Sequence, residues 1–272
     1  MPGDVDGNLV PDAALIGSGS VAELVLGVDS TPTKVRFGGA ALAADIGVAP
    51  GDVASSLITV VKTASSFEWR STSVLTGGSR VFKTTLGLGV PVVGCYREST
   101  YTAASYVPSR VTGSIRYYTG GSDVVVKLPV GVMLARCGAP VNGTSAVFTL
   151  VKNAKRKTLN VVARSGASQI FSSAVIDSKL SQKGMLLGTV PRGTGQHPTA
   201  MILARKGKVP MLYVRDKANK WQPITLPSAG PGTTPTGFTS VRVGTATFIV
   251  VQFTNAAKDT SYKTVLVPAG YL

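Results

Sequence analysis

The stretch Arg110-Val-Thr-Gly-Ser-Ile-Arg-Tyr-Tyr118 alternates between two kinds of position. Val111, Gly113, Ile115 and Tyr117 fall on one face of an extended chain, and Arg, Thr, Ser and Tyr residues fall on the other. Successive side chains of a β-strand point to opposite faces of its sheet, so a period of two is typical of a strand buried on one face. This stretch therefore predicts a half-buried β-strand.

The composition extends this prediction to the rest of the chain. Hydrophobic residues make up 44% of the 272 residues and charged residues only 15%, and Val, Thr, Ser, Ala and Gly are abundant. Such a composition favours strands and turns over helices and is too apolar for a disordered chain. A chain of this length can bury a large core without disulfides or metals. We therefore expect a mostly β protein with one large or two ordinary domains.

Apolar runs separated by turn residues place the individual strands. Single strands are expected at residues 57–62, 67–75, 80–86, 91–97, 110–118 and 123–135. Hairpins are expected where 146–151 meets 159–163, where 201–204 meets 209–214, and where 247–253 meets 262–267. A short helix is expected only around residues 40–46.

These strands fit two architectures. The first is an antiparallel β-sandwich or jelly-roll-like body behind an irregular N-terminal arm, which needs only strands, turns and partial alternation. The alternative is a small β-propeller, which the weak repetition of the hairpins suggests, although no motif recurs at a fixed period.

The domain organisation follows from turn residues and charge. We expect an acidic arm or docking segment over residues 1–54, a β domain over 55–140 and a basic, hairpin-rich β domain over 141–272. The boundary between the two domains is placed in the turn-rich segment 138–145. Residues 55–272 are alternatively one continuous domain.

Charge is distributed unevenly along the chain. The formal net charge is +15, and residues 152–220 hold fourteen Lys and Arg but only two acids, Asp177 and Asp216. Residues 1–60 have the opposite sign, with two basic and seven acidic side chains. A basic excess of this size attracts polyanions such as nucleic acid or anionic glycans, although a merely solvated basic face would give the same pattern.

The basic residues of this region concentrate near the turns of two predicted hairpins. If both hairpins point the same way, their turns form one polyanion-binding patch, made of Lys152, Lys155, Arg156, Lys157, Arg205, Lys206 and Lys208. Binding that neutralises six to ten phosphates would weaken by roughly 10³- to 10⁵-fold between 50 and 200 mM salt.

A second candidate binding surface lies upstream, where five of the eight tyrosines fall within residues 96–118. Aromatic rings beside Arg can stack on bases or sugars, and protein interfaces also favour them. The candidate interface and stacking residues are Tyr96, Arg97, Tyr101, Tyr106, Arg116 and Tyr118. The alternative is ordinary packing of the rings within a sheet, with the hydroxyls at its rim.

The chain offers little for catalysis. It contains one histidine, His197, and thirteen acids, seven of them before residue 61, and neither a phosphate-binding loop nor a nucleophile-elbow motif occurs. Asp177 and Asp216 are interpreted as local partners of the surrounding Lys and Arg. One His and two distant Cys do not suggest a zinc site. We therefore expect no catalytic residues, no metal and no cofactor.

Two further features bear on the environment of the protein. Cys95 and Cys137 are too few to define a disulfide framework, and we expect both to be buried thiols. The first residues lack the basic and apolar regions of a secretory signal. Because no run reaches eighteen apolar residues, no membrane span is expected.

Together these features favour a non-enzymatic structural subunit of a large assembly. A virus or phage particle protein, such as a coat, tail or decoration component of the virion, would contact copies of itself and other particle subunits, with its basic face toward a polyanion. The alternative is a stand-alone β-rich module, extracellular or at the cell surface, that binds nucleic acid or an anionic cell-surface glycan. A hydrolase that uses scattered Asp residues and His197 is the least favoured class.

Overall fold

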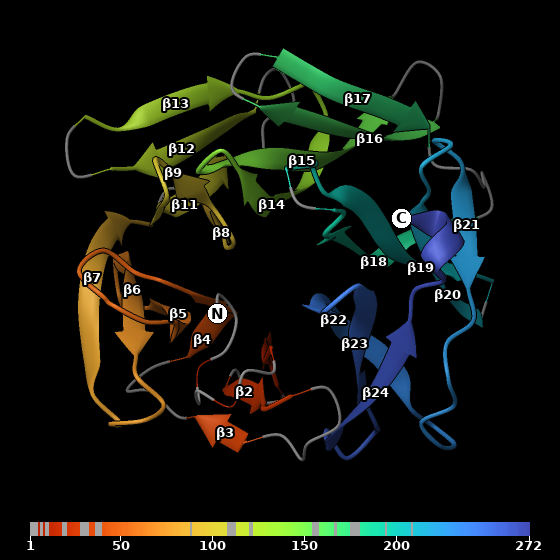
Figure 1. Cartoon of the computed structure of the whole chain (residues 1–272), viewed down its shortest axis with the longest axis horizontal. Helices are drawn as coiled ribbons and strands as arrows, with labels where there is room; N and C mark the ends of the chain where they lie inside the picture. The colour runs from red at the N-terminus through yellow and green to blue at the C-terminus, as the bar shows by residue number, and fades with distance from the viewer. Residues whose placement is uncertain are drawn as a thin grey trace. The chain divides into compact units, whose positions relative to one another are not determined.

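The structure is a computed structural model of the chain, and its regular elements are almost all β-strands (Figure 1). It describes residues 5, 8, 11–17, 21–27, 33–35, 40–87, 89–107, 113–119, 122–153, 158–165, 168–174, 180–193, 195–207 and 209–272. Within these ranges the only helical element is a short 3₁₀ turn at Ala269–Tyr271. The prediction of a mostly β protein is therefore confirmed.

The chain divides into two compact units, each made of two segments. The first unit contains Met1–Gly87 and Pro227–Leu266, and the second contains Leu88–Leu226 and Val267–Leu272. Each unit is described separately below.

The first unit holds three small antiparallel sheets whose strands follow chain order. One has four strands, β4 (Ala41–Gly47), β5 (Ser56–Lys62), β6 (Ser66–Thr72) and β7 (Ser79–Leu86). Two have three strands each, β1 (Ala13–Ile16), β2 (Ala22–Val25) and β3 (Thr33–Val35), and β22 (Thr234–Val243), β23 (Ala246–Thr254) and β24 (Thr260–Leu266).

The helix expected around residues 40–46 is wrong, because this segment is strand β4. It pairs antiparallel with β5, where Ala44 lies opposite Thr59 and Ile46 opposite Leu57. The alanines of the segment favour a helix, but pairing with the almost completely buried β5 outweighs that preference. The irregular arm expected over residues 1–54 is likewise not what the described part shows, since it contains β1 to β4.

The second unit holds three four-stranded antiparallel sheets. The first is β8 (Val90–Val92), β11 (Ala103–Val107), β12 (Ser114–Tyr118) and β13 (Val124–Lys127). The second is β14 (Val132–Val141), β15 (Thr144–Asn153), β16 (Thr158–Ser165) and β17 (Ser168–Ala174). The third is β18 (Leu180–Val190), β19 (Thr199–Lys206), β20 (Val209–Arg215) and β21 (Trp221–Ile224). A small hairpin, β9 (Tyr96–Arg97) with β10 (Thr100–Tyr101), interrupts the first sheet.

All three predicted hairpins are confirmed, as β15 with β16, β19 with β20, and β23 with β24. The alternating stretch that predicted a half-buried strand contains β12, in which Ile115 and Tyr117 are buried and Arg116 is exposed. The first three residues of that stretch, 110–112, lie outside the described residues.

Sheets built from consecutive, antiparallel neighbouring strands are the blades from which β-propellers are made (Figure 1). The described strands therefore support the propeller alternative. The sandwich or jelly-roll prediction is not confirmed, because Greek-key connections would pair strands distant in the chain, whereas neighbours in these sheets are close in sequence.

Cys95 and Cys137 form a disulfide with a Cα to Cα distance of 5.0 Å, so the prediction of two buried thiols is wrong. The bond joins the segment after β8 to β14 and closes a loop of 42 residues. Both residues are buried, at 0% and 3% exposure, within the apolar cluster between these sheets. Whether two cysteines pair depends on their spatial separation, which their spacing in the sequence does not give.

Candidate functional site

The second unit contains a pocket of about 400 Å³. It is lined by parts of β9, β12, β13, β15 and β16, by the turn between β14 and β15, and by the segment between β18 and β19. These elements are distant in the chain, and the sheets of this one unit bring them together.

The charged lining of the pocket is entirely basic. Arg97 comes from β9, Arg164 from β16 and His197 from the segment that precedes β19. Among the described lining residues there is no Asp or Glu. The His197 Nδ1 atom is buried and has no hydrogen-bond partner among the described protein atoms. The pocket therefore presents positive charge and an unused imidazole nitrogen.

Arg97 is held over an aromatic ring. Its guanidinium carbon lies 5.2 Å from the centre of the Tyr117 ring, which is a cation–π distance. Burial raises the pKa of Tyr117 to about 12, although the charge of Arg97 opposes this shift. The Tyr117 phenol is therefore neutral at physiological pH.

Arg164 reaches the pocket from the apolar face of its sheet. In the pairing of β15 with β16 it lies directly opposite Val147, which belongs to the buried cluster around the disulfide. A shift of register between Ala163 and Arg164 marks an irregularity in the pairing of β16 with β17. Such bulges re-aim a side chain. Arg164 is thus one of the two arginines among the described residues that line the pocket.

Two tight turns pack against each other beside Arg97 and Asn142, which line the pocket. Glu98 and Ser99 have φ of 50° and 63° in the β9–β10 turn, and Asn142 and Gly143 have φ of 51° and 76° in the β14–β15 turn. Both pairs have the left-handed conformation of hairpin turns, which Asn-Gly favours. The Ser99 amide donates a hydrogen bond to the Gly143 carbonyl at 2.8 Å, which joins the turns. Residues 138–145, where the domain boundary was predicted, thus belong to a hairpin.

The hairpin that carries Arg97 is fastened to β15 by Ser145. The Ser145 hydroxyl accepts a hydrogen bond from the Tyr96 amide at 3.0 Å and donates one to the Gly94 carbonyl at 3.1 Å. The disulfide at Cys95 anchors the same segment to β14. Arg97 therefore stands on a short hairpin fixed by one covalent and several polar contacts.

The remaining lining combines polar and apolar groups. Asn142, Thr144 and Ser165 supply an amide and two hydroxyls besides that of Ser145. The apolar wall is formed by Val126, Leu128, Val141 and Val147. A pocket of this kind can hold an anionic group by charge-assisted hydrogen bonds and the body of a ligand by apolar contact.

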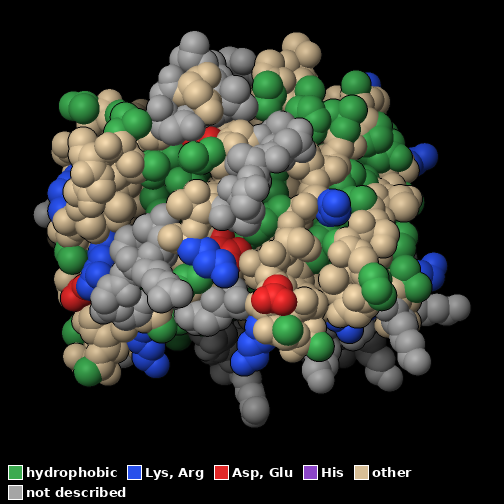
Figure 2. All heavy atoms as spheres, turned by 90° about the horizontal axis from the view of Figure 1, so that it is seen from below, with side chains coloured by type: hydrophobic (Ala, Val, Ile, Leu, Met, Phe, Trp, Pro, Cys, Tyr) green, Lys and Arg blue, Asp and Glu red, His purple; other side chains and the backbone are tan. Residues whose placement is uncertain are grey.

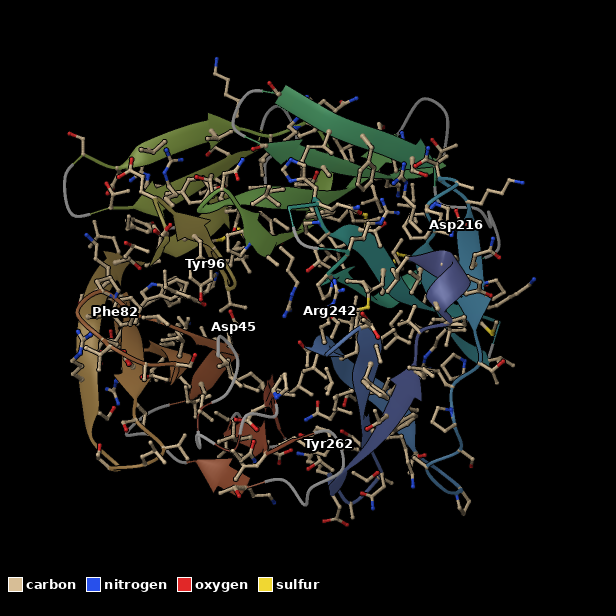
Figure 3. The ribbon with its side chains drawn as sticks, viewed as in Figure 1. Asp45, Phe82, Tyr96, Asp216, Arg242 and Tyr262 are labelled. Carbon is tan, nitrogen blue, oxygen red and sulfur yellow. A yellow bond between two sulfur atoms is a disulfide. The ribbon has the colours of Figure 1, made fainter. Side chains whose placement is uncertain are left out.

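The predicted tyrosines mostly serve the packing of the sheet. The Tyr106 hydroxyl donates to the Met133 carbonyl at 2.8 Å, the Tyr118 hydroxyl bonds the Ser105 hydroxyl at 2.9 Å, and the Tyr101 hydroxyl accepts from the Gly94 amide at 3.0 Å. Tyr96, which is labelled in Figure 3, packs edge-on against Tyr101, and their ring centres are 5.2 Å apart. Of the six predicted interface and stacking residues, only Arg97 lines the pocket. Arg116 instead lies 4.0 Å from Asp123, across the surface of β12.

Only three of the seven residues of the predicted basic patch lie within the described residues. Lys152 lies near the end of β15, and Arg205 and Lys206 lie at the end of β19, all three exposed. The other four residues, Lys155, Arg156, Lys157 and Lys208, lie outside the described residues. Joining of the two tips into one patch stays a prediction. On the face seen in Figure 2, Lys and Arg side chains stand mostly singly among hydrophobic and other side chains.

Asp216 has a local structural role. Its carboxylate accepts hydrogen bonds from the Gln222 amide at 2.7 Å and from the Lys220 backbone at 2.8 Å, which close the turn between β20 and β21. Asp216 is labelled in Figure 3. The hydrogen bond from Gln222 contributes most to lowering the pKa of Asp216, and burial opposes it. Asp177 lies outside the described residues.

A second polar cluster, which sequence reasoning missed, lies in the first unit. Glu23 of β2 is completely buried, and its carboxylate accepts hydrogen bonds from Thr260 at 2.9 Å, from Tyr262 and from Gln252 at 3.4 Å. The hydroxyl of Tyr262, which is labelled in Figure 3, also accepts a hydrogen bond from Gln252 at 2.8 Å. The cluster ties a strand near the start of the chain to β23 and β24. The feature of the sequence that could have indicated this cluster is the acidic residue within the otherwise apolar run Ala22-Glu-Leu-Val25.

Comparisons with known proteins do not assign the chain to a family. No protein-family model matches it, and no curated protein matches it either. Among solved structures, a chain in the crystal structure of the S. cerevisiae core factor matches with a TM-score of 0.45 and 11% identity, over 93% of this chain and 53% of that chain. This chain thus spans about half the length of the matched chain.

The described residues contain neither a membrane-spanning helix nor a cluster of metal-binding side chains. No described helix has the length and apolar character needed to cross a membrane. No group of three or more His, Cys, Asp or Glu side chains is placed to hold a metal ion within the part of the chain that the structure describes.

Proposed function

We propose that this protein is a non-enzymatic, β-propeller-like binding module that takes up an anionic ligand in the pocket of its second unit. The observation that carries the proposal is the pocket lining, in which Arg97, Arg164 and His197 supply the charged or protonatable groups and no described lining residue is an acid. The proposal follows the alternative function expected from the sequence and gives it a defined site.

The physical basis is the geometry of guanidinium groups. Arg presents several N–H donors in a planar fork that matches carboxylate, sulfate and phosphate oxygens, and such charge-assisted hydrogen bonds are stronger than neutral ones. The partly enclosed pocket and its apolar wall strengthen these contacts because they displace water around the charges. The ring of Tyr117 holds Arg97 in place before the ligand arrives.

The disulfide supports an oxidising location for this function. Disulfides persist in secreted, cell-surface and virion proteins and are rare in reducing compartments. The Cys95–Cys137 bond fastens the hairpin that carries Arg97, so the site itself depends on it. We therefore propose that the module works outside the reducing cytosol.

The test is binding of simple anions to the full chain at constant ionic strength. Sulfate, phosphate and acetate are titrated while backbone amide shifts near the pocket are followed by NMR. Arg97→Gln and Arg164→Gln should each weaken binding roughly tenfold or more, because a hydrogen bond to a charged group is lost. Lys217→Gln, which removes one exposed charge from the same unit, is the matched control. Equal effects of the three substitutions would contradict a specific site.

The second candidate function is a structural subunit of a large particle, with its basic face toward a polyanion. It is favoured by apolar side chains along β7, the edge strand of its sheet, where Val81 is 47% and Leu86 is 68% exposed. Exposed apolar edges are contact surfaces in assemblies. Native mass from light scattering at low and high salt tests it, because a salt-independent monomer would remove the support for self-assembly.

A further inference from the structure

The size of the pocket indicates what kind of anion it takes. Its volume of about 400 Å³ would hold about a dozen water molecules at the density of the liquid. An inorganic oxyanion such as sulfate has only about five non-hydrogen atoms, so it would leave most of this space unfilled. The natural ligand therefore has a larger uncharged part, here called its body, as well as an anionic group.

The lining indicates the chemistry of that body. Val126, Leu128 and Val147 supply apolar side chains to the lining, while Asn142 and Thr144 supply an amide and a hydroxyl. A purely apolar body would leave these polar groups unpaired, and a purely polar body would gain nothing from the wall. A pyranose ring fits both requirements, because it has an apolar C–H face and hydroxyls around its rim.

The charge indicates the substituent on the ring. Arg97 and Arg164 reach the pocket from different strands, and both are suited to bind a planar carboxylate through two parallel N–H groups. The lining has no described acid that would repel such a group.

From these three observations we infer that the pocket binds a hexuronic acid, with its carboxylate at Arg97 and Arg164 and its ring along the aliphatic wall. The inference rests on the proposed function and specifies its ligand. The hydroxyl of Thr144 serves a ring hydroxyl and does not contact the carboxylate.

The experiment compares glucuronate, glucose, acetate and inorganic phosphate on the full chain at constant ionic strength, by titration calorimetry with NMR to locate the site. Glucuronate should bind at least about tenfold more tightly than acetate, since the ring adds hydrogen bonds and apolar contact. Glucose should bind more weakly than glucuronate by a similar factor, because it lacks the charge-assisted contacts.

Three variants separate the parts of the site. Arg97→Lys, which keeps the charge but loses the fork, and Arg164→Gln should each weaken glucuronate binding roughly tenfold. Thr144→Val, close to Thr in shape, should weaken glucuronate but leave acetate unchanged. Lys217→Gln should leave both unchanged, and unchanged thermal midpoints show that each variant is folded.

The outcomes distinguish the inference from the function on which it rests. If acetate, phosphate and glucuronate bind equally and all are weakened by Arg164→Gln, the uronate inference is overturned while anion binding stands. If no anion responds to Arg97→Lys or Arg164→Gln, both are overturned. A uronate oligosaccharide that binds more tightly than the monomer identifies the source as the end of an acidic glycan, and equal binding identifies a free sugar acid.

Discussion

Asp52 in the first unit is a carboxylate whose neighbours favour its charged form. It accepts hydrogen bonds from the Ser71 hydroxyl and from Arg80, whose Nε lies 3.2 Å from the Asp52 Oδ1. Partial burial opposes ionisation of Asp52, but the hydrogen bonds from Ser71 and Arg80 and the charge of Arg80 outweigh it, so its pKa is lowered. The hydrogen bonds of Asp52 with Ser71 and Arg80 join the segment after β4 to β6 and β7.

The lowered pKa of Asp52 predicts a loss of stability in acid. A carboxyl whose pKa is lower in the folded than in the unfolded state stabilises the fold above its unfolded value, and this contribution is lost as the pH falls through its folded value. We expect Asp52→Asn to lower the free energy of unfolding by about 1 kcal/mol at neutral pH, as for partly exposed ion pairs. At a pH below the pKa of Asp52 in the folded state, the substitution should have no effect. Urea unfolding at several pH values measures this, and a cost that does not vary with pH would contradict it.

Glu23 is completely buried, and its carboxyl oxygens accept hydrogen bonds from the side chains of Thr260, Tyr262 and Gln252. We expect Glu23→Gln to lower the free energy of unfolding by about 2 to 3 kcal/mol, because one acceptor oxygen becomes an NH₂ donor, and Thr260, Tyr262 and Gln252 must then share the single oxygen that remains. Tyr262→Phe removes one donor to Glu23 and one acceptor of Gln252, but Glu23 keeps Thr260 and Gln252 as donors, so it should cost less. Urea unfolding of both variants gives the comparison, and a larger cost for Tyr262→Phe would show that Glu23 is not the centre of the cluster.

At the scale of elements, the type of turn between β14 and β15 decides how close two hairpins come. Gly143 has φ of 76°, and a Cβ added there would lie 2.6 Å from the Ser99 hydroxyl and 2.9 Å from the Ser99 backbone nitrogen. The position therefore excludes a side chain for two reasons, the left-handed conformation and the contact with β9–β10.

Gly143→Ala should separate these two reasons when it is compared with Gly184→Ala. Gly184 has a similar φ of 72°, but an added Cβ would meet nothing within 4 Å. Gly184→Ala should cost only the strain of the conformation, about 1 to 2 kcal/mol, whereas Gly143→Ala should cost more and also weaken anion binding through displaced Arg97. Equal thermal midpoints and equal affinities for the two variants would mean that the contact between the turns is unimportant.

The elements themselves could be predicted from the sequence to a large extent. Period-two alternation around Ile115 placed β12, and apolar runs separated by turn residues placed three hairpins, because these signals are local. The alanine-rich β4 was wrongly expected to be helical, since only its pairing with β5 makes it a strand. The pocket could not be predicted, because Arg97, Arg164 and His197 meet only through the packing of three sheets. The cluster of tyrosines predicted a binding surface, but the hydroxyls of Tyr101, Tyr106 and Tyr118 form hydrogen bonds within the protein.

For the whole molecule, the disulfide is the largest single constraint that the sequence analysis did not anticipate. It closes a loop of 42 residues within the second unit, and loop-closure entropy gives it a stabilisation of about 4 kcal/mol. Paired and free cysteines could not be distinguished from the sequence, because pairing depends on the 5.0 Å approach of their Cα atoms.

Reduction of the disulfide should therefore destabilise the second unit and weaken anion binding. In urea unfolding with and without dithiothreitol, we expect the reduced protein to lose about 4 kcal/mol, and a Cys95→Ala, Cys137→Ala variant to be insensitive to the reductant. Intrinsic tryptophan fluorescence follows the transition, since Trp221 belongs to this unit and Trp69 to the other. An unchanged midpoint after complete reduction would show that the bond adds no stability.

The two-segment construction of the first unit has a consequence during protein synthesis. Its β1 to β7 leave the ribosome first, but β22 to β24, which complete this unit, follow only after about 140 further residues. At a translation rate of about 5 to 20 residues per second, the early segment waits roughly 7 to 28 seconds for its partner. Leu88–Leu226, which forms nearly all of the second unit, emerges during that interval. The nascent chain therefore exposes the apolar side of β1 and β2 until its last strands arrive, and this interval is when chaperones would be needed most.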